Sequence, residues 1–176
     1  MPTEAARAAE GREPQMICMA RVDDRLIHGQ VAVKWSKELN ISRIIVASDH
    51  VAANAVQVAA LKGAAPAGVK AAILPIEKAV SILDDPRSAD LRILLISNDP
   101  ADLLAVFKGI KERPVLNVAN YGRINGPIST KTKVSDSVYL TEDDKKVIHE
   151  ISDLGVEVIH QPLPSDDRKN LLDLIG

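Results

Sequence analysis

The stretch Arg21-Val-Asp-Asp-Arg-Leu-Ile-His-Gly-Gln-Val31 lies between two segments with different hydrophobic patterns. The preceding residues, Met16–Ala20, form a short apolar run that predicts a strand. After the stretch, Val31, Trp35 and Leu39 are spaced by four residues, which predicts a helix with one apolar face. The charged stretch is therefore predicted to lie in a turn that leaves a strand and enters a helix. In an open α/β sheet, ligands bind at that edge.

The rest of the chain alternates between predicted strands and helices, with strand ends roughly every 20 to 26 residues, the length of a strand plus a crossover helix. This rhythm predicts the α/β class: a single open, doubly wound, mostly parallel β-sheet with helices on both faces. Asn54, Asp99, Thr141 and Ser165 are the predicted helix N-caps. The further predicted strands are 43–48, 69–74, 91–96, 115–119, 138–140 and 156–160, and the further predicted helices are 54–63, 75–84, 100–110, 141–154 and 165–175.

The composition excludes several classes of protein. A net charge of −2 and four aromatic residues argue against a nucleic-acid partner. The lone cysteine, Cys18, excludes a disulfide framework and fits a reducing cytosol. No apolar run reaches the roughly 18 residues of a membrane span.

Residues 1–15 are predicted to be a flexible N-terminal tail, and residues 16–176 a single domain. We expect neither a metal nor a cofactor, because metal-ligand spacing and nucleotide-binding glycine patterns are missing from the sequence.

The residues crowded into the predicted turn suit transfer of a phosphoryl group through histidine. A neutral imidazole, here His28, is nucleophilic, and the positive end of a helix favours the neutral form. Arg25 could bind two phosphate oxygens. Either Asp24 or Asp23 could bond the second ring nitrogen and fix the tautomer. Alternatively, Asp24 caps the helix, and Arg25 and His28 are solvated loop residues.

Other residues at the same predicted sheet edge could contact phosphate. Gly29 and Gln30 open the helix, where backbone N–H groups are free to bind an anion. Ser97 leaves another strand at this edge and could donate to a phosphate, or it could be an ordinary strand-end residue. Asp99 is expected only to cap its helix.

The loop 120–133 is long for a compact domain, and such loops are usually functional or mobile. Its basic residues, Arg123, Lys131 and Lys133, could complement phosphate or an acidic partner, or they could be solvated charges. The three other histidines are expected outside the chemistry: His50 in a loop, and His149 and His160 on the surface.

The stretch 21–31 resembles the active-site segment of IIB components of the mannose/fructose/sorbose family of the bacterial sugar phosphotransferase system. Further segments are similar to family segments in the same order, so the resemblance covers about residues 16–176. The chain departs from the family at Ala119-Asn120-Tyr121, where many members have Gly-Gly-Met. The similar segments are 44–49, 64–70, 94–100 and 164–175.

The resemblance implies a cytoplasmic phosphotransferase subunit that is associated with the inner face of the membrane through IIC and IID components. His28 would accept a phosphoryl group on Nδ1 from a phosphohistidine of IIA and deliver it to a sugar held by IIC and IID. Arg25 matches the arginine that contacts the phosphoryl group. The family's sheet is mostly parallel with one antiparallel strand, and its first strand is central.

Two other functions remain open from the residues alone. The chain could be a regulatory protein that uses phosphorylation of His28 as a switch. It could also be a non-catalytic α/β domain that binds an anion or a small molecule. Whether the chain forms a homodimer is left open as well.

Overall fold

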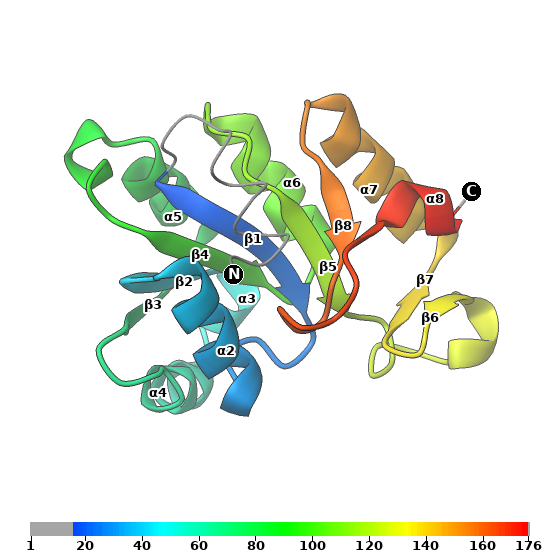
Figure 1. Cartoon of the computed structure of the whole chain (residues 1–176), viewed down its shortest axis with the longest axis horizontal. Helices are drawn as coiled ribbons and strands as arrows, with labels where there is room; N and C mark the ends of the chain where they lie inside the picture. Colours follow the sequence, from blue (N-terminus) through cyan, green and yellow to red (C-terminus); the bar gives the residue numbers. More distant parts are fainter. Residues whose placement is uncertain (1–15, 176) are drawn as a thin grey trace.

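The computed structural model describes residues 16–175. Its main sheet has seven strands in the order β3-β2-β4-β1-β5-β8-β9 (Figure 1). Every neighbouring pair is parallel except β8 with β9. The predicted α/β class, the central first strand and the one antiparallel strand are confirmed. The strands of this sheet are β1 (Ile17–Asp23), β2 (Arg43–Ala47), β3 (Lys70–Leu74), β4 (Ile93–Ser97), β5 (Leu116–Asn120), β8 (Val158–His160) and β9 (Lys169–Asn170).

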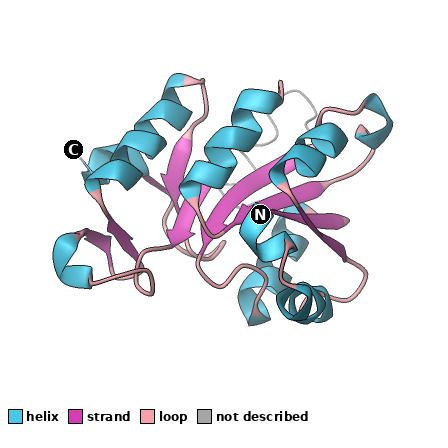
Figure 2. Cartoon of the chain, turned by 180° about the vertical axis from the view of Figure 1, so that it is seen from behind, coloured by secondary structure: helices cyan, strands magenta, loops and turns pink. Residues whose placement is uncertain are grey.

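Helices cover both faces of the sheet, as the figures show from opposite sides (Figures 1 and 2). Alternate residues of β2 contact different cores, because successive strand side chains point to opposite faces. Ile44 packs in the core that contains Trp35, and Ile45 in the core that contains Phe107. One face carries α2 (Gly29–Leu39), α3 (Asp49–Ala52) and α4 (Ala55–Gly63), and the other carries α5 (Ile76–Leu83), α6 (Pro100–Gly109), α7 (Glu142–Asp153) and α8 (Leu171–Ile175).

Three of the predicted helix starts are confirmed by side-chain caps. The Asn54 side chain accepts from the backbone N–H of Gln57, and the Asp99 side chain from that of Ala101. Thr141 and Asp144 form a capping box at the start of α7. Short-range signals were therefore sufficient to place these helices.

Two predictions for the second half of the chain are wrong. Strand β7 (Val138–Leu140) does not join the main sheet; it pairs antiparallel with β6 (Thr132–Ser135) in a separate two-stranded sheet. Ser165 does not cap a helix, because residues 169–170 form β9 and only the last turn is helical. Three residues of β7 and two of β9 are too few for a periodic pattern to show which partner they pair with.

Smaller differences concern short elements. Strand β1 continues to Asp23, so part of the charged stretch belongs to the sheet and not to the turn. Helix α3 was not predicted, and neither were the 3-10 turns Pro86–Ser88 and Ile128–Thr130. The predicted tail, residues 1–15, lies outside the described residues.

The topology places a switch point at the carboxyl end of β1. The chain leaves β1 for α2 on one face, whereas the connections after the neighbouring strands β4 and β5 lead to α6 and α7 on the other face. Connections that diverge in this way open a crevice beside the strand ends, where ligands bind in such folds. His28 lies in the connection between β1 and α2, directly before the helix.

Candidate functional site

Asp23, the last residue of β1, is the centre of the site. Its side chain is fully buried. Its Oδ1 accepts from the backbone N–H of Arg25 at 2.9 Å and from Nδ2 of Asn120 at 3.3 Å. Its Oδ2 accepts from Nε and Nη2 of Arg21 and lies 3.0 Å from Nε2 of His28. Both oxygens are thus held by groups from β1, β5 and the turn after β1.

This contact determines which nitrogen of His28 is free. An ionised carboxylate only accepts hydrogen bonds, so Nε2 of His28 must carry the proton in the bond to Asp23. In the neutral ring, Nδ1 then keeps its lone pair. The His28 side chain is 16% exposed, so the ring can be reached from outside. The geometry presents Nδ1 as the nucleophile.

Arg21 anchors Asp23 from the same face of β1, since the two residues are two positions apart in a strand. Its side chain is 3% exposed. Nη1 donates to the carbonyl oxygen of Pro162 at 3.1 Å, and the guanidinium carbon lies 6.0 Å from the Trp35 ring centroid. The indole of Trp35 donates to the same Pro162 oxygen at 2.8 Å. Burial lowers the pKa of Arg21, and the Asp23 carboxylate opposes that shift.

The turn between β1 and α2 is fixed by buried apolar side chains. Leu26 and Ile27 are each 3% exposed and pack into the core under α2. Leu26 adopts a φ of 57°, a left-handed conformation that costs a non-glycine residue about 1–2 kcal/mol. Gly29 follows at a φ of 46°. Packing therefore holds His28 in place against local backbone strain.

Within residues 16–175, the backbone N–H groups of Gly29 and Gln30 at the start of helix α2 have no hydrogen-bond acceptor. His28 is the N-cap, and the first helical hydrogen bond runs from the N–H of Ala32 to the carbonyl of His28. The first turn contains no acidic residue, so the positive end of the helix is not neutralised from within. Gly29 and Gln30 are exposed there, as a phosphate-binding role would require.

The two other charged residues of the turn, Arg25 and Asp24, lie in different environments. Arg25 is exposed, and its side chain makes no hydrogen bond or ion pair within residues 16–175. Asp24 does not contact His28; its Oδ2 accepts from the backbone N–H of Gly122 at 2.9 Å. Asp23, and not Asp24, is the residue that bonds the second ring nitrogen. Burial raises the pKa of Asp24, and the backbone N–H groups of Gly122 and Arg123 partly offset this.

Ser97 lies at the end of β4, but its hydroxyl has other partners. It is fully buried, donates to Oδ2 of Asp102 at 3.0 Å and accepts from the N–H of Asp99 at 3.3 Å. This geometry does not favour a bond from Ser97 to phosphate. Burial raises the pKa of Asp102, and the bond from Ser97 opposes that shift.

The other histidines differ in burial. His50 is exposed in α3 and His149 is exposed in α7. The expectation for His160 is wrong, because it is 6% exposed and its Nδ1 lies 2.7 Å from the carbonyl oxygen of Val118. Its place at the end of a buried strand, which the sequence did show, favoured burial. Within the described range, no cluster of three or more His, Cys, Asp or Glu side chains could hold a metal ion.

The loop after β5 is attached to the histidine turn at its base, through Asn120 and through Gly122. Two of its three basic residues have partners inside the loop or the adjoining hairpin. Nζ of Lys131 donates to the carbonyl oxygens of Gly122 and Asn125, and Lys133 pairs with Asp136 at 3.1 Å. Arg123 is exposed. Among the basic residues of the turn and the loop, Arg25 and Arg123 have exposed side chains, whereas Lys131 holds the loop together.

Sequence reasoning missed Arg21, Asn120, Trp35 and the Pro162 carbonyl. For Arg21 and Asp23 a signal existed, because an Arg and an Asp two residues apart in an apolar strand share one face. The remaining contacts join segments far apart in the chain, and local patterns carry no information about them.

The fold and the site define a doubly wound α/β protein with a partly exposed histidine at its switch point. Residues 17–176 match the family model for the PTS system sorbose subfamily IIB component. The chain belongs to this family: it is a IIB component of a sugar phosphotransferase system, with transferase and sugar-transport function. In the described part of the chain, no helix is long and apolar enough to cross a membrane.

Relatives and solved structures agree with this assignment. A probable phosphotransferase enzyme IIB component of Streptococcus pyogenes serotype M6 is 39% identical over 92% of this chain and 100% of its own length. The mannose-specific EIIAB component of Escherichia coli K12 is 36% identical over 92% of this chain and 49% of its own length. The crystal structure of the IIBSor domain of the sorbose permease from Klebsiella pneumoniae has a TM-score of 0.84 and 34% identity, covering 92% of this chain and 96% of that one.

Proposed function

We propose that Nδ1 of His28 accepts a phosphoryl group from a phosphohistidine of a IIA protein or domain and passes it to a sugar held by membrane IIC and IID components. The observation that best supports this is the bond from Nε2 of His28 to the buried Asp23 carboxylate, which leaves Nδ1 free. The name EIIAB of the mannose-specific relative joins IIA and IIB in one protein, which supports a IIA donor. The chain would act in the cytoplasm, held at the membrane through IIC and IID.

The transfer balances without a metal or a nucleotide. The lone pair of His28 Nδ1 forms a bond to phosphorus while the donor's P–N bond breaks, and the donor nitrogen keeps that electron pair. The His28 ring gains positive charge as it attacks, and the Asp23 carboxylate at Nε2 stabilises that charge. In the second step a sugar hydroxyl oxygen attacks phosphorus, its proton passes to a base, and the His28 ring leaves neutral.

The phosphoryl oxygens would be held by the start of α2 and by Arg25. Backbone N–H groups of Gly29 and Gln30 precede the first helical hydrogen bond, so they are available to an anion. Arg25 is fixed through its backbone bond to Asp23 while its guanidinium is exposed. The guanidinium could therefore close on two phosphate oxygens. Asp24 would act indirectly, by holding the Gly122 loop beside the turn.

The test is phosphate transfer from a labelled cognate phospho-IIA. We expect the wild type and His50→Ala to become labelled and His28→Ala to remain unlabelled, because His50 is exposed but lies on α3. The label should resist base and be lost in acid, as a phosphoramidate is. Membranes containing IIC and IID with sugar should then discharge it. Label that persists under these conditions would indicate a regulatory switch, and no labelling at all would indicate an anion-binding domain without turnover.

A further inference from the structure

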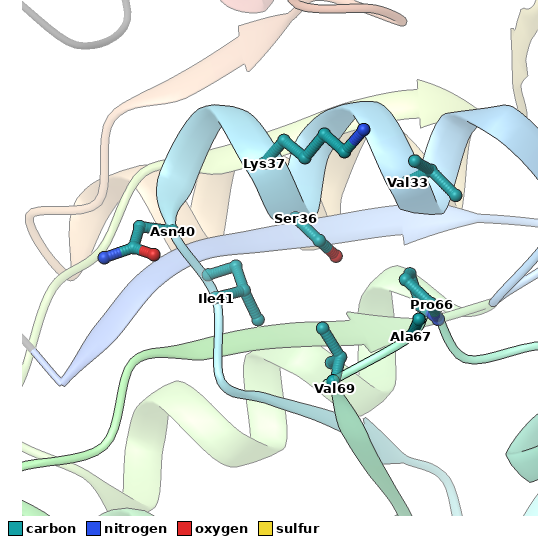
Figure 3. Close-up of a pocket in the computed structure, with 9 residues that line it drawn as sticks. Val33, Ser36, Lys37, Asn40, Ile41, Pro66, Ala67 and Val69 are labelled. Carbon is teal, nitrogen blue, oxygen red and sulfur yellow. The ribbon is translucent and has the colours of Figure 1, made fainter.

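The C-terminal half of α2, away from His28, borders a pocket. A pocket of about 410 Å³, here called the α2 pocket, separates the C-terminal half of α2 from residues 66–69, which lead into β3 (Figure 3). Ser36 lies eight positions after His28, which corresponds to about 12 Å along a helix axis. The α2 pocket therefore opens near the amino ends of β2 and β3, whereas His28 lies at the carboxyl end of β1.

Ser36 gives this pocket an unsatisfied polar group. The residue is 6% exposed, and its Oγ has no hydrogen-bond partner among the described residues. Figure 3 shows the hydroxyl pointing from the helix toward the wall formed by Pro66 and Ala67. A buried hydroxyl without a partner is costly. A ligand acceptor in the pocket would remove that cost.

The charge of the lining favours an anion. Lys37 and Asn40 line the pocket together with Ser36, and no acidic side chain of residues 16–175 is part of the lining. A hydroxyl, an ammonium and an amide are therefore the side-chain donors available to a negatively charged group.

The C-terminal end of α2 would normally repel an anion, because its free carbonyls carry partial negative charge. Here those carbonyls are occupied. The guanidinium of Arg92 donates to the backbone carbonyl oxygens of Leu39 and Asn40. The backbone N–H of Ile41 donates to the backbone carbonyl oxygen of Ser36 at 2.9 Å. The positive charge of Arg92 also offsets the helix end.

The remaining lining is apolar. Val33 faces Pro66 and Ala67, and Ile41 lies beside Val69 (Figure 3). The volume falls in the range of small-molecule sites, which combine apolar walls with a few polar groups. We propose that the α2 pocket binds a small organic anion, with a carboxylate or phosphate head at Ser36 and Lys37 and a short hydrocarbon body between Val33 and residues 66–69. This proposal does not depend on phosphorylation of His28.

The test uses the full chain and four probes. Butyrate and butyl phosphate carry both head and body, inorganic phosphate lacks the body, and butanol lacks the charge. Titrations followed by amide NMR should show saturable shifts at residues 36–41 and 67–69 with butyrate or butyl phosphate, and weaker effects with the other two. The stronger of the two organic anions identifies the head group.

Three variants and two controls complete the experiment. Ser36→Ala should weaken binding about tenfold, the value of a hydrogen bond to a charged group. Lys37→Gln should reduce the preference for a charged probe over butanol, and Ala67→Phe should block the pocket. Lys34→Gln, exposed on the same helix outside the lining, should bind like the wild type. His28→Ala should also bind normally, which separates this site from the phosphoryl site.

The proposal is overturned if neither organic anion gives saturable shifts in the wild type. It is also overturned if butanol binds as well as the anions, or if binding survives both Ser36→Ala and Ala67→Phe unchanged. Binding that disappears in His28→Ala would place the anion at the start of α2 instead.

Discussion

Nε2 of His28 lies 3.0 Å from Oδ2 of Asp23, a carboxylate with no solvent exposure. The same oxygen is bonded by the guanidinium of Arg21. The histidine is therefore oriented by a buried ion pair inside the sheet. This arrangement makes both the tautomer and the position of His28 properties of the folded core.

The first prediction concerns that tautomer. When the His28 ring of the wild-type protein is neutral, its proton should reside on Nε2, because the Asp23 carboxylate can only accept a hydrogen bond. Long-range proton–nitrogen NMR of the imidazole rings measures this directly, with the exposed His149 as an internal comparison. In Asp23→Asn the preference should weaken, since an amide can donate as well as accept. A wild-type His28 protonated on Nδ1 would contradict the proposed acceptor atom.

The second prediction compares two arginines four residues apart. Arg21→Ala should lower the free energy of unfolding by about 3–5 kcal/mol, because it leaves the Asp23 carboxylate buried without its partner. Arg25→Ala should change stability by less than about 0.5 kcal/mol, since the side chain is exposed. Urea unfolding gives both values.

Phosphate transfer tests the role of Arg25 directly. Arg25→Ala should slow labelling of the folded protein, and Arg25→Lys should slow it less, because charge is kept but the planar pair of donors is lost. Wild-type rates in both Arg25 variants would show that Arg25 is only a solvated residue.

The third prediction concerns the base of the loop after β5. Gly122 has a φ of 93°, and a Cβ there would lie 1.9 Å from the backbone oxygen of Tyr139. Gly126 has a φ of 81° with open space around it. Gly126→Ala should cost about 1–2 kcal/mol of backbone strain alone, and Gly122→Ala should cost clearly more. Equal losses of thermal stability in the two variants would argue against this close approach.

The fourth prediction follows from the raised pKa of Asp24. In the pH range between the ordinary pKa of an aspartate, near 3.9, and the raised pKa of Asp24 in the folded protein, the folded state binds more protons than the unfolded state. The contribution of Asp24 to stability therefore falls as the pH rises through that range. Asp24→Asn removes this term and keeps an oxygen for the Gly122 N–H, so its stability relative to wild type should improve from pH 4 to pH 7. A relative stability that declines over the same interval would refute the assignment.

The fifth prediction concerns docking and rests on the proposed function. Arg123 is exposed on a loop attached to the histidine turn, so Arg123→Glu should slow phosphorylation by phospho-IIA at low salt. The effect should shrink near 1 M salt, where the screening length is about 3 Å. Lys146→Glu, exposed on α7, is the matched control. A loss of rate that is the same at both salt concentrations would exclude a role in charge steering.

The sequence alone determined the parts of the structure that depend on neighbours in the chain. Apolar runs located the long strands of the main sheet, and Asn54, Asp99 and Thr141 marked helix starts through caps that reach only two or three residues. The alternation of these elements determined the α/β class. The stretch 21–31 placed His28 between β1 and α2, at the sheet edge where sites of this fold form.

The tertiary structure decided which residues serve His28. Asp23 and Asp24 are adjacent in sequence, but the strand carries Asp23 into the core beside Arg21 and leaves Asp24 to meet Gly122, 98 positions away. Trp35 and Arg21 both donate to the Pro162 carbonyl oxygen, a contact that no local sequence pattern predicts. The pairing of β7 with β6, outside the main sheet, was also not predictable from a local pattern. Such contacts form only when the whole core closes, because their energy comes from burial and hydrogen bonds between segments that sequence spacing does not relate.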